Sequence, residues 1–433
     1  MSDPLRVGIA GLGTVGASVA QLLRQDAARL AQACGRDITI AAVCARDRGR
    51  DRGVDLGHAR WYDDPAAMAA SGDIDLVVEL IGGEDGAARA TVEAALGAGH
   101  HVVTANKALL AHHGVALARL AEKHAAGLYF EAAVAGGIPV IKALRESLAG
   151  NRISRVYGIL NGTCNYILTR MEREGSDFSD VLADAQAKGY AEADPTFDIG
   201  GFDTAHKLAI LTSLAFGTEI DLDSVYVEGI TNIGPEDLAA ADELGYRIKL
   251  LGVALVTETG IEQRVHPTMV AKRTPIAEID GVTNAVAIDG HFVGEVMLVG
   301  PGAGGRATAS AVVGDICDAA RGIMVPPLRV PASELAPYQR AQMRAHEGGY
   351  YIRLSVYDRP GAFAAIAARM AEQGISLESI VQRAAHSPGS SEPKPVILIT
   401  HETTEAQVRE ALDIIGADGH IERDPQMIRI EQA

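Results

Sequence analysis

The densest group of reactive side chains in this sequence lies between Gly189 and Lys207. The segment holds four carboxylates, a histidine and a lysine, and its second half has the apolar spacing of a helix. On that helix Asp203 and Lys207 are four positions apart and point the same way. Most such pairs are surface ion pairs that contribute a few tenths of a kcal/mol. A functional role is favoured here because the preceding carboxylates, Glu192 and Asp198 among them, would repel one another unless a cation or an ammonium group joined them.

A glycine-rich turn stands near the start of the chain. Residues 6–10 predict a short buried strand and residues 17–33 an amphipathic helix. Between them lies a Gly-x-Gly-x-x-Gly motif, formed by Gly11, Leu12, Gly13, Thr14, Val15 and Gly16. In this setting the glycines let the backbone approach a pyrophosphate, and the helix N-terminus supplies N–H groups. The motif therefore predicts NAD(P) binding.

The second predicted strand, residues 38–43, bears on the choice of cofactor. In NAD-binding folds such a strand ends near an acidic residue that binds the adenosine ribose. Here it runs into a loop that contains Arg46, Asp47 and further arginines. Arg46 suits a 2′-phosphate, so NADP is favoured. Asp47 leaves NAD open, and a solvated basic loop is the alternative without a function.

Further strands complete a predicted parallel sheet. Residues 76–81 and 101–104 predict strands with helix 86–97 between them, and strand alternating with helix indicates parallel pairing. Thr104 and Lys107 stand at the carboxyl edge of this sheet, where doubly wound folds bind ligands. We expect both to contact cofactor or substrate, and a surface charge is the alternative for Lys107.

Another strand is predicted over residues 127–134, ahead of a glycine–proline turn at residues 136–139 and a helix at residues 140–148. Backbone carbonyls left free at such a turn bind either water or a hard cation.

The middle of the chain predicts an α+β unit. After a strand at residues 153–160, Asn161 and Thr163 at a strand-to-helix junction offer donors to an anionic group. A helix at residues 180–188 precedes the acidic segment. Strands are expected at residues 248–256, 261–270, 282–288 and 295–299. We expect an antiparallel sheet that carries a dimer interface on one face.

A second glycine loop, Gly300–Gly305, opens a predicted helix at residues 306–321 and is placed to help wrap the same cofactor. We therefore expect the chain to return to its first domain there. Prolines between residues 326 and 337 predict a linker. The expected domains are 1–140 completed by 301–325, then 141–300, a linker 326–349, and 350–433.

The last unit predicts strand, helix, two strands, helix and a short closing strand, which is the ferredoxin-like order. Strands are expected at residues 350–356, 375–383 and 395–400, with helices at 362–373 and 405–415. With Asp358-Arg-Pro-Gly361 before its first helix, this unit resembles the ACT domain, a module that binds small amino acids as allosteric effectors.

Composition excludes several classes of function. The chain has 433 residues and a net charge of −17, so nucleic acid and anionic membranes would repel it. The cysteines Cys34, Cys44, Cys164 and Cys317 have no metal-binding or disulfide-framework spacing. The N-terminus leads directly into a strand, and no apolar run approaches the ~18 residues of a membrane span. We expect a soluble cytoplasmic protein.

The chain resembles homoserine dehydrogenases over essentially its whole length. The matching segments, in order, are Gly11–Gly16, Thr104–Lys107, Glu131–Pro139, Asn161–Thr163, Gly189–Lys207 and Gly300–Gly305. The resemblance implies a Rossmann-type domain, an α+β catalytic and dimerisation domain and a C-terminal ACT domain. It also implies reversible reduction of L-aspartate 4-semialdehyde to L-homoserine with NAD(P)H, on the route to threonine, isoleucine and methionine.

The same resemblance implies roles for single residues. Lys207 is the candidate proton donor, and Lys107 is ranked second. Asp203 either binds substrate directly or orients Lys207. Glu192 is implied for the substrate ammonium, Thr163 is our choice for its carboxylate, and Asp198 either binds substrate or shapes the loop. Gly189 and Gly305 are assigned to the cofactor. Carbonyls of four residues match positions where the family binds a monovalent cation such as sodium: Glu131, Val134, Gly136 and Ile138.

Two other interpretations stay open at this point. One is a different NAD(P)-dependent dehydrogenase of amino or hydroxy acids, and the other is a non-catalytic sensor of dinucleotide and amino acid. From the C-terminal unit we expect inhibition by threonine, and we expect a homodimer or homotetramer.

Overall fold

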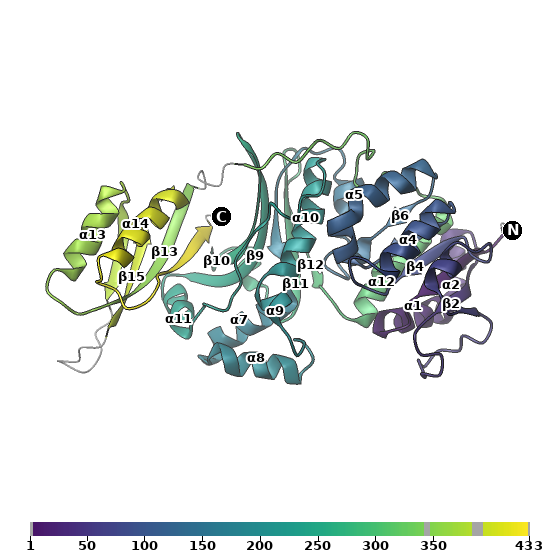
Figure 1. Ribbon diagram of the computed structural model, residues 1–433, viewed down its shortest axis with the longest axis horizontal. Coiled ribbons are helices and arrows are strands. Elements are labelled where there is room, and N and C mark those ends of the chain that lie inside the picture. Colours follow the sequence, from purple (N-terminus) through teal and green to yellow (C-terminus); the bar gives the residue numbers. More distant parts are fainter. Residues whose placement is uncertain (1–2, 342–346, 383–392, 432–433) are drawn as a thin grey trace.

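The computed structural model describes residues 3–341, 347–382 and 393–431. Figure 1 shows three parts in a row, with the N-terminus at one end of the molecule and the ACT-like unit at the other. The C-terminus lies in the middle of the row, beside the central sheet. In the part of the chain that the structure describes, no helix is long and apolar enough to cross a membrane.

The N-terminal part is built on a parallel sheet with the order β3-β2-β1-β4-β5-β6. The strands are β1 (Leu5–Ala10), β2 (Ile38–Cys44), β3 (Arg60–Tyr62), β4 (Leu76–Glu79), β5 (His101–Thr104) and β6 (Leu128–Tyr129). Five helices lie between these strands: α1 (Thr14–Gln25), α2 (Ala27–Cys34), α3 (Pro65–Ala69), α4 (Ala87–Gly97) and α5 (Lys107–Lys123). The order in which strands are added to the sheet reverses between β1 and β4, which is where such sheets bind ligands. The predicted Rossmann-type sheet is confirmed.

Two local predictions in this part are wrong. The helix expected over residues 17–33 is divided at Asp26, whose backbone leaves the helical region and whose carboxylate binds Arg29. The strand expected over residues 127–134 pairs only at β6. Beyond it the buried carboxylate of Glu131 accepts N–H groups from Ile141 and Lys142, at 2.8 and 2.9 Å, and turns the chain inward.

Short helical turns replace the rest of that strand and the helix expected at residues 140–148. They are the 3-10 helix Glu131–Ala133, α6 (Val140–Lys142) and the π-helical turn Ala143–Ser147.

The middle part contains an antiparallel run of strands in the order β12-β11-β7-β9-β10. These are β7 (Ile153–Ile159), β9 (Tyr246–Thr257), β10 (Gly260–Ala271), β11 (Thr283–Gly290) and β12 (Gly294–Pro301), and β8 (Tyr226–Val227) pairs with β10. Its helices are α7 (Gly162–Glu174), α8 (Phe178–Ala187), α9 (Thr196–Ile199), α10 (Phe202–Phe216), α11 (Pro235–Glu243) and the 3-10 helix Pro275–Glu278. The predicted α+β unit is confirmed, with strand bounds within a few residues of expectation.

Helix α12 (Gly305–Arg321) packs against α1, and its apolar side chains join the core of the N-terminal sheet. A methyl group on Gly305 would stand 2.9 Å from the Thr14 methyl and 3.0 Å from the Ser18 hydroxyl. The N-termini of the two helices that follow glycine loops therefore lie together.

The C-terminal part has the sheet order β17-β13-β15-β14, covered by two helices. Its elements are β13 (Glu347–Val356), α13 (Ala362–Glu372), β14 (Leu377–Gln382), β15 (Lys394–Thr400), β16 (Thr403–Thr404), α14 (Glu405–Ala417) and β17 (Gln426–Glu431). The ferredoxin-like prediction is confirmed. The strand end expected at Arg383, the loop after it and residues 342–346 of the expected linker lie outside the described residues.

Strand β17 joins the C-terminal part to the middle part. It pairs in parallel with β10, with Thr268 opposite Arg429, so one sheet of 11 strands runs through both parts. Arg429 is fully buried and donates to Glu405 at 2.6 and 3.0 Å, and it also reaches Glu228 of the middle part at 3.3 Å. A buried ion pair thus lies where β17 of the C-terminal part meets the middle part, a junction that we call the seam.

We expect Glu405→Gln to lower the free energy of unfolding by about 3 kcal/mol, because it leaves the Arg429 charge buried without its carboxylate. Burial raises the pKa of Glu405, but the bonds and charge of Arg429 and Arg409 outweigh it and bring the pKa below its ordinary value of 4.5. The stabilisation is therefore present above that value and is lost as the pH falls through the lower, folded-state pKa. Urea unfolding followed by circular dichroism across this pH range measures both effects.

The matched control is Glu372→Gln, which removes a carboxylate from the exposed pair with Arg369. It should leave the unfolding midpoint unchanged. Equal midpoints for the two variants at neutral pH would contradict the role given to the seam.

Candidate functional site

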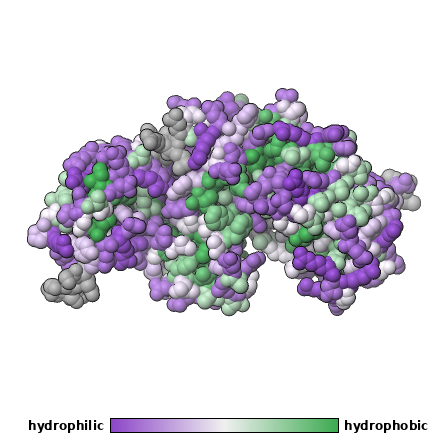
Figure 2. Space-filling view, viewed as in Figure 1, coloured by the Kyte–Doolittle hydropathy of each residue, from purple (hydrophilic) through white to green (hydrophobic). Residues whose placement is uncertain are grey.

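A cleft of about 960 Å³ lies between the N-terminal and middle parts. Val15, Ala105 and Lys107 line it from the carboxyl edge of the parallel sheet, and the start of α7, the acidic segment and the second glycine loop line it from the other side. Figure 2 shows the molecule hollowed where these two parts meet.

The carboxylate of Asp203 joins two lysines in this cleft. Gly201, in the left-handed region with φ 87°, starts α10, and Asp203 stands in its first turn with 5% of its surface exposed. One oxygen accepts from Lys207 Nζ at 2.6 Å, and the other pairs with Lys107 Nζ at 3.1 Å. Because Lys107 comes from the N-terminal part, a single carboxylate holds ammonium groups from both walls of the cleft.

Asn161 and the two lysines relieve part of the crowding of carboxylates that the sequence predicted, at Asp198 and Asp203, whereas Glu192 stays exposed. The Asn161 amide donates to Asp198 at 2.8 Å and to Asp203 at 2.9 Å. Burial raises the pKa of Asp203, but Lys207, Lys107 and Asn161 together bring it well below its ordinary range, so this carboxylate is ionised. Burial and the Asp203 charge raise the pKa of Asp198.

Lys207 has one donor left for a ligand. Its ammonium donates to the Leu160 carbonyl at 2.7 Å and to Asp203 at 2.6 Å, and an ammonium carries three N–H groups. Lys207 lines the cleft, although only 9% of its surface is exposed. The arrangement therefore fixes an ammonium group next to any molecule in the cleft.

Lys107 is positioned by the end of β5. Asn106 caps α5 by accepting the N–H of Leu109 at 3.1 Å, and the Lys107 ammonium lies 5.7 Å from the ring centre of Phe197. Thr104 is fully buried and donates to Glu79 at 2.6 Å. Its side chain supports the sheet edge and does not line the cleft.

His206 packs beside this centre. Its ring meets the ring of Phe197 at 5.2 Å and that of His112 at 5.4 Å, centre to centre. Burial, with the nearby His112 and Lys107, lowers the pKa of His206 to about 4. The ring is therefore neutral near pH 7.

The acidic segment is tethered to its neighbours at its start. The Thr163 hydroxyl donates to the Tyr190 carbonyl at 2.7 Å, and Gln186 donates to the Glu192 carbonyl at 3.0 Å. Gly189 has φ 74°, which favours glycine at this turn. These contacts hold the exposed carboxylate of Glu192 at the cleft wall.

The first glycine loop fits a dinucleotide. A methyl group on Gly11 would stand 2.5 Å from the Leu80 carbonyl, and one on Gly16 would overlap the Gly11 carbonyl. At Gly13 a methyl group would meet nothing within 4 Å. The outer glycines are therefore needed for packing, while the middle one faces open space in front of the α1 N-terminus, where a pyrophosphate is favoured.

The arginine-rich loop lies beside this motif. Arg52 donates to the Leu12 carbonyl at 3.3 Å and thereby ties the two loops together. The guanidinium groups of Arg48 and Arg52 lie 5.4 and 5.6 Å from the ring centre of Trp61, the one tryptophan of the chain. Arg46 is exposed on the same loop.

One of the four residues of the predicted cation site lines the cleft. Gly136 lines the cleft with φ 49°, and a methyl group on it would overlap the Gly302 carbonyl. The Ile138 carbonyl already accepts the N–H of Val140 at 2.8 Å. Among the described residues, no three His, Cys, Asp or Glu side chains form a group that could hold a metal ion.

The structure brings part of the predicted site together. Predicted residues that line the cleft are Val15, Lys107, Gly136, Thr163, Gly189, Glu192, Asp198, Asp203 and Lys207. Those outside its lining are Gly11, Leu12, Gly13, Thr14, Gly16, Arg46, Thr104, Glu131, Val134, Ile138 and Gly305. The sequence indicated no role for Phe197, Asn284 or Thr308, and it did not predict that Asn161 bridges two carboxylates. Only Asn161 carried a signal, which was its place at a predicted strand-to-helix junction.

Three protein-family models match the chain. The family model for homoserine dehydrogenase matches residues 139–317, that for the homoserine dehydrogenase NAD binding domain matches residues 11–131, and that for the ACT domain matches residues 350–418.

Individual relatives extend the match to the full length. Homoserine dehydrogenase of Neisseria gonorrhoeae is 45% identical over 99% of each chain. The crystal structure of a homoserine dehydrogenase from Thiobacillus denitrificans superposes with a TM-score of 0.92 at 43% identity, over 99% of each chain. A hyperthermophilic archaeal homoserine dehydrogenase in complex with NADPH gives a TM-score of 0.63 at 28% identity, over 73% of this chain and 97% of that one.

These matches favour neither a different dehydrogenase nor a non-catalytic sensor. With its cleft, its paired lysines and its full-length relatives, the chain belongs to the homoserine dehydrogenase family.

Proposed function

We propose that this enzyme interconverts L-aspartate 4-semialdehyde and L-homoserine by proton transfer at Lys207, with Asp203 as the group that positions the lysine. The observation that carries the proposal is the Asp203 carboxylate, which bonds both Lys207 and Lys107 inside the cleft. The bound nicotinamide cofactor supplies the hydride for the reduction.

The chemistry needs a proton at the aldehyde oxygen. As the aldehyde carbon gains a C–H bond, the electrons of the C=O double bond move to oxygen, which takes a proton from the Lys207 ammonium. The amine of Lys207 then regains a proton from water. Asp203 holds the Lys207 ammonium in position through its hydrogen bond, and Lys107 is proposed as a contact of substrate and cofactor.

The substrate carries an ammonium group and a carboxylate, and each needs a partner of the opposite charge. Glu192 is the proposed partner of its ammonium, and Asp198 adds negative charge on the same side of the cleft. The Thr163 hydroxyl is already used by Tyr190, so we assign the carboxylate to N–H groups at the start of α7. A helix N-terminus attracts anions through its free N–H groups and its dipole.

NADP is the proposed cofactor. Arg46 and Arg48 stand on the loop that Arg52 ties to the glycine motif, where the adenosine end of a dinucleotide would lie. The archaeal relative bound to NADPH supports the same choice.

Several predictions of the sequence stay proposals. These are a sodium ion on the carbonyls of Glu131, Val134, Gly136 and Ile138, the four-way division of the chain into domains, and a cytoplasmic location. A homodimer or homotetramer is also proposed, and its support is the exposed apolar side chains beside the edge strand β12: Phe292, Val293 and Val299. No step of the reaction is assigned to the cation.

The proposed allosteric function rests on the ACT domain. A cavity of about 560 Å³ lies where β13, β15 and β17 meet the ends of β9 and β10. Arg273, Glu378 and Glu402 are among its lining residues, so it offers a cation for a carboxylate and carboxylates for an ammonium group. We propose threonine as the effector bound there.

Lys207→Ala should lower kcat for semialdehyde reduction at least ~100-fold, the low end for loss of a positioned acid–base group. Lys107→Ala should raise KM more than it lowers kcat, because Lys107 is proposed to act mainly by contact. Steady-state kinetics with purified enzyme measures both. Lys272→Ala removes an exposed lysine paired with Asp242 and is the control. Normal turnover by the Lys207 variant would refute its role.

Arg46→Ala with Arg48→Ala should weaken NADPH binding about tenfold or more and leave NADH binding unchanged, because only NADPH offers a 2′-phosphate to these charges. Quenching of Trp61 fluorescence during titration reports binding next to this loop. Arg29→Ala, at an exposed pair with Asp26, is the matched control. An equal loss for both dinucleotides would exclude a phosphate contact.

Threonine should inhibit the wild-type enzyme, and Arg273→Ala should raise the threonine concentration for half inhibition about tenfold through loss of a charged contact. A chain without residues 350–433 should be insensitive, although it also uncovers the edge of β10. Assays at increasing threonine concentrations test both, with Arg423→Ala as a surface control. Unchanged sensitivity in both variants would rule out the proposed regulation.

A further inference from the structure

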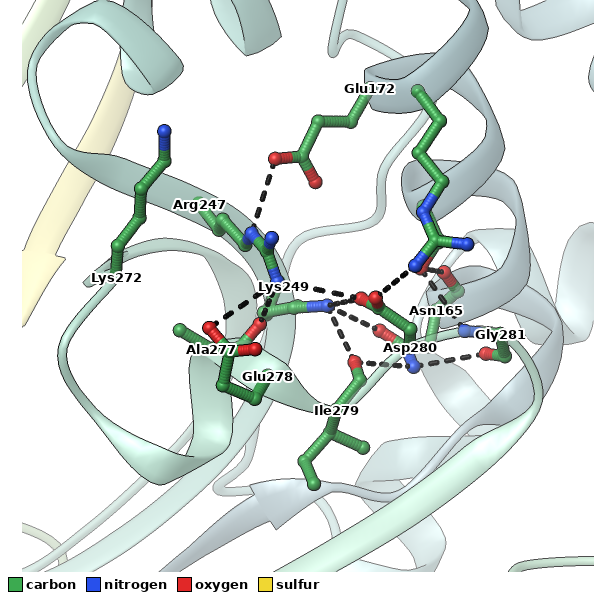
Figure 3. Close-up of polar contacts among 12 residues, drawn as sticks. Asn165, Glu172, Arg247, Lys249, Lys272, Ala277, Glu278, Ile279, Asp280 and Gly281 are labelled. Carbon is green, nitrogen blue, oxygen red and sulfur yellow. Dashed lines mark hydrogen bonds and ion pairs between the residues drawn. The ribbon is translucent and has the colours of Figure 1, made fainter.

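A polar clamp fixes the segment 279–283, which leads into β11. The Asn165 amide donates to the carbonyls of Ile279, Gly281 and Thr283 at 3.1, 2.9 and 3.3 Å. Lys249, with 1% of its surface exposed, donates to the same Ile279 carbonyl at 2.6 Å (Figure 3). These bonds replace the ladder that a regular strand would provide.

Helix α7 holds the segment along two turns. Asn165, Thr169 and Arg173 are four positions apart and lie on one face of the helix. Thr169 accepts the N–H of Gly281 at 3.3 Å, and Arg173 pairs with Asp280 at 2.5 Å. The start of β11 is therefore fixed relative to α7, the helix whose first residues line the cleft.

Asn284 is the second residue of β11, so the clamp fixes the position of its side chain. It lines the cleft with 1% of its surface exposed. Within the described part of the chain, its Oδ1 is buried and has no hydrogen-bond partner. A buried amide oxygen without a partner costs about 1–3 kcal/mol, so its retention beside a ligand cleft indicates a partner supplied by the ligand.

The neighbours of Asn284 belong to the cofactor side. Its side chain lies against Gly302, where an added methyl group would overlap all three end atoms of the amide, and its strand partner is Gly300. This glycine loop leads into α12, whose N-terminus contacts Thr14 at the start of α1. Asn284 therefore lies next to the loop that, with the first glycine motif, faces the dinucleotide.

We propose that Oδ1 of Asn284 accepts a hydrogen bond from the carboxamide NH₂ of the nicotinamide ring and thereby fixes the orientation of the ring. A neutral acceptor suits a neutral amide donor, whereas the ammonium and carboxylate of the substrate are better matched by the charged groups and helix terminus on the other wall. The clamp gives the acceptor a fixed position before the cofactor binds, which reduces the entropy lost on binding.

An analogue of the cofactor tests this contact in the wild-type chain. In 3-acetylpyridine adenine dinucleotide phosphate a methyl group replaces the NH₂ of nicotinamide, so no donor is present. We expect it to bind about tenfold more weakly than NADP⁺. Calorimetric titration measures both dissociation constants without turnover, and NAD⁺ with its acetylpyridine analogue gives the same comparison if the enzyme prefers NAD. Equal affinities would overturn the proposal.

Asn284→Leu keeps a side chain of similar volume against Gly302 but removes both polar atoms of the amide. It should bind NADP⁺ about as weakly as the wild type binds the analogue, and it should no longer distinguish the two. Its affinity for 2′-phospho-ADP-ribose, which lacks nicotinamide, should stay within twofold of the wild type. A loss of affinity for this fragment as large as that for NADP⁺ would mean that Asn284 only supports the glycine loop, and the proposal would fail.

The matched control is Asn151→Leu. Asn151 contacts the turn of the hairpin that β11 and β12 form, where its amide oxygen accepts N–H groups of Phe292 and Val293 at 3.3 and 3.2 Å. This variant should distinguish NADP⁺ from the analogue as the wild type does. If it also loses that discrimination, the effect belongs to the hairpin as a whole and contradicts a direct contact.

Discussion

The catalytic arrangement depends on one ionised carboxylate shared by two lysines. Asp203 comes from the middle part of the chain, as does Lys207, while Lys107 comes from the parallel sheet. The carboxylate stays charged although it is buried, because the two ammonium groups and Asn161 more than offset the cost of its desolvation. The same interaction that prepares an acid for the reaction therefore also holds the two walls of the cleft in register.

The rest of the fold presents groups to that centre from well-packed elements. Lys107 is the first residue of α5, just after β5, and Asn161 caps α7, just after β7. Asp203 stands in the first turn of α10, which follows a glycine with positive φ. A residue at the end of a strand or in the first turn of a helix has its backbone fixed by hydrogen bonds on one side only. Its side chain can therefore face the cleft without a loss of packing behind it.

Sequence alone predicted the fold class and the paired residues on α10, because strand–turn–helix periodicity and the i,i+4 spacing are local properties. It did not predict the short strand β6, since the inward turn there depends on contacts of Glu131 with residues ten positions later and with Asp315 on α12. Phe197 and Asn284 were missed for the same reason. An aromatic ring or an amide gains a function only through neighbours that are distant in the sequence, and composition does not reveal those neighbours.

The pairing of β17 with β10 has a consequence for synthesis on the ribosome. Residues 268–270 receive their partner from a strand about 160 positions later. Until that strand has emerged, the nascent chain presents an open hydrogen-bonding edge in the middle of its central sheet, and open edges of this kind recruit other strands. The molecule is thus vulnerable to co-translational misassembly for a long stretch of its elongation, and its solubility in cells should respond to changes in chaperone supply.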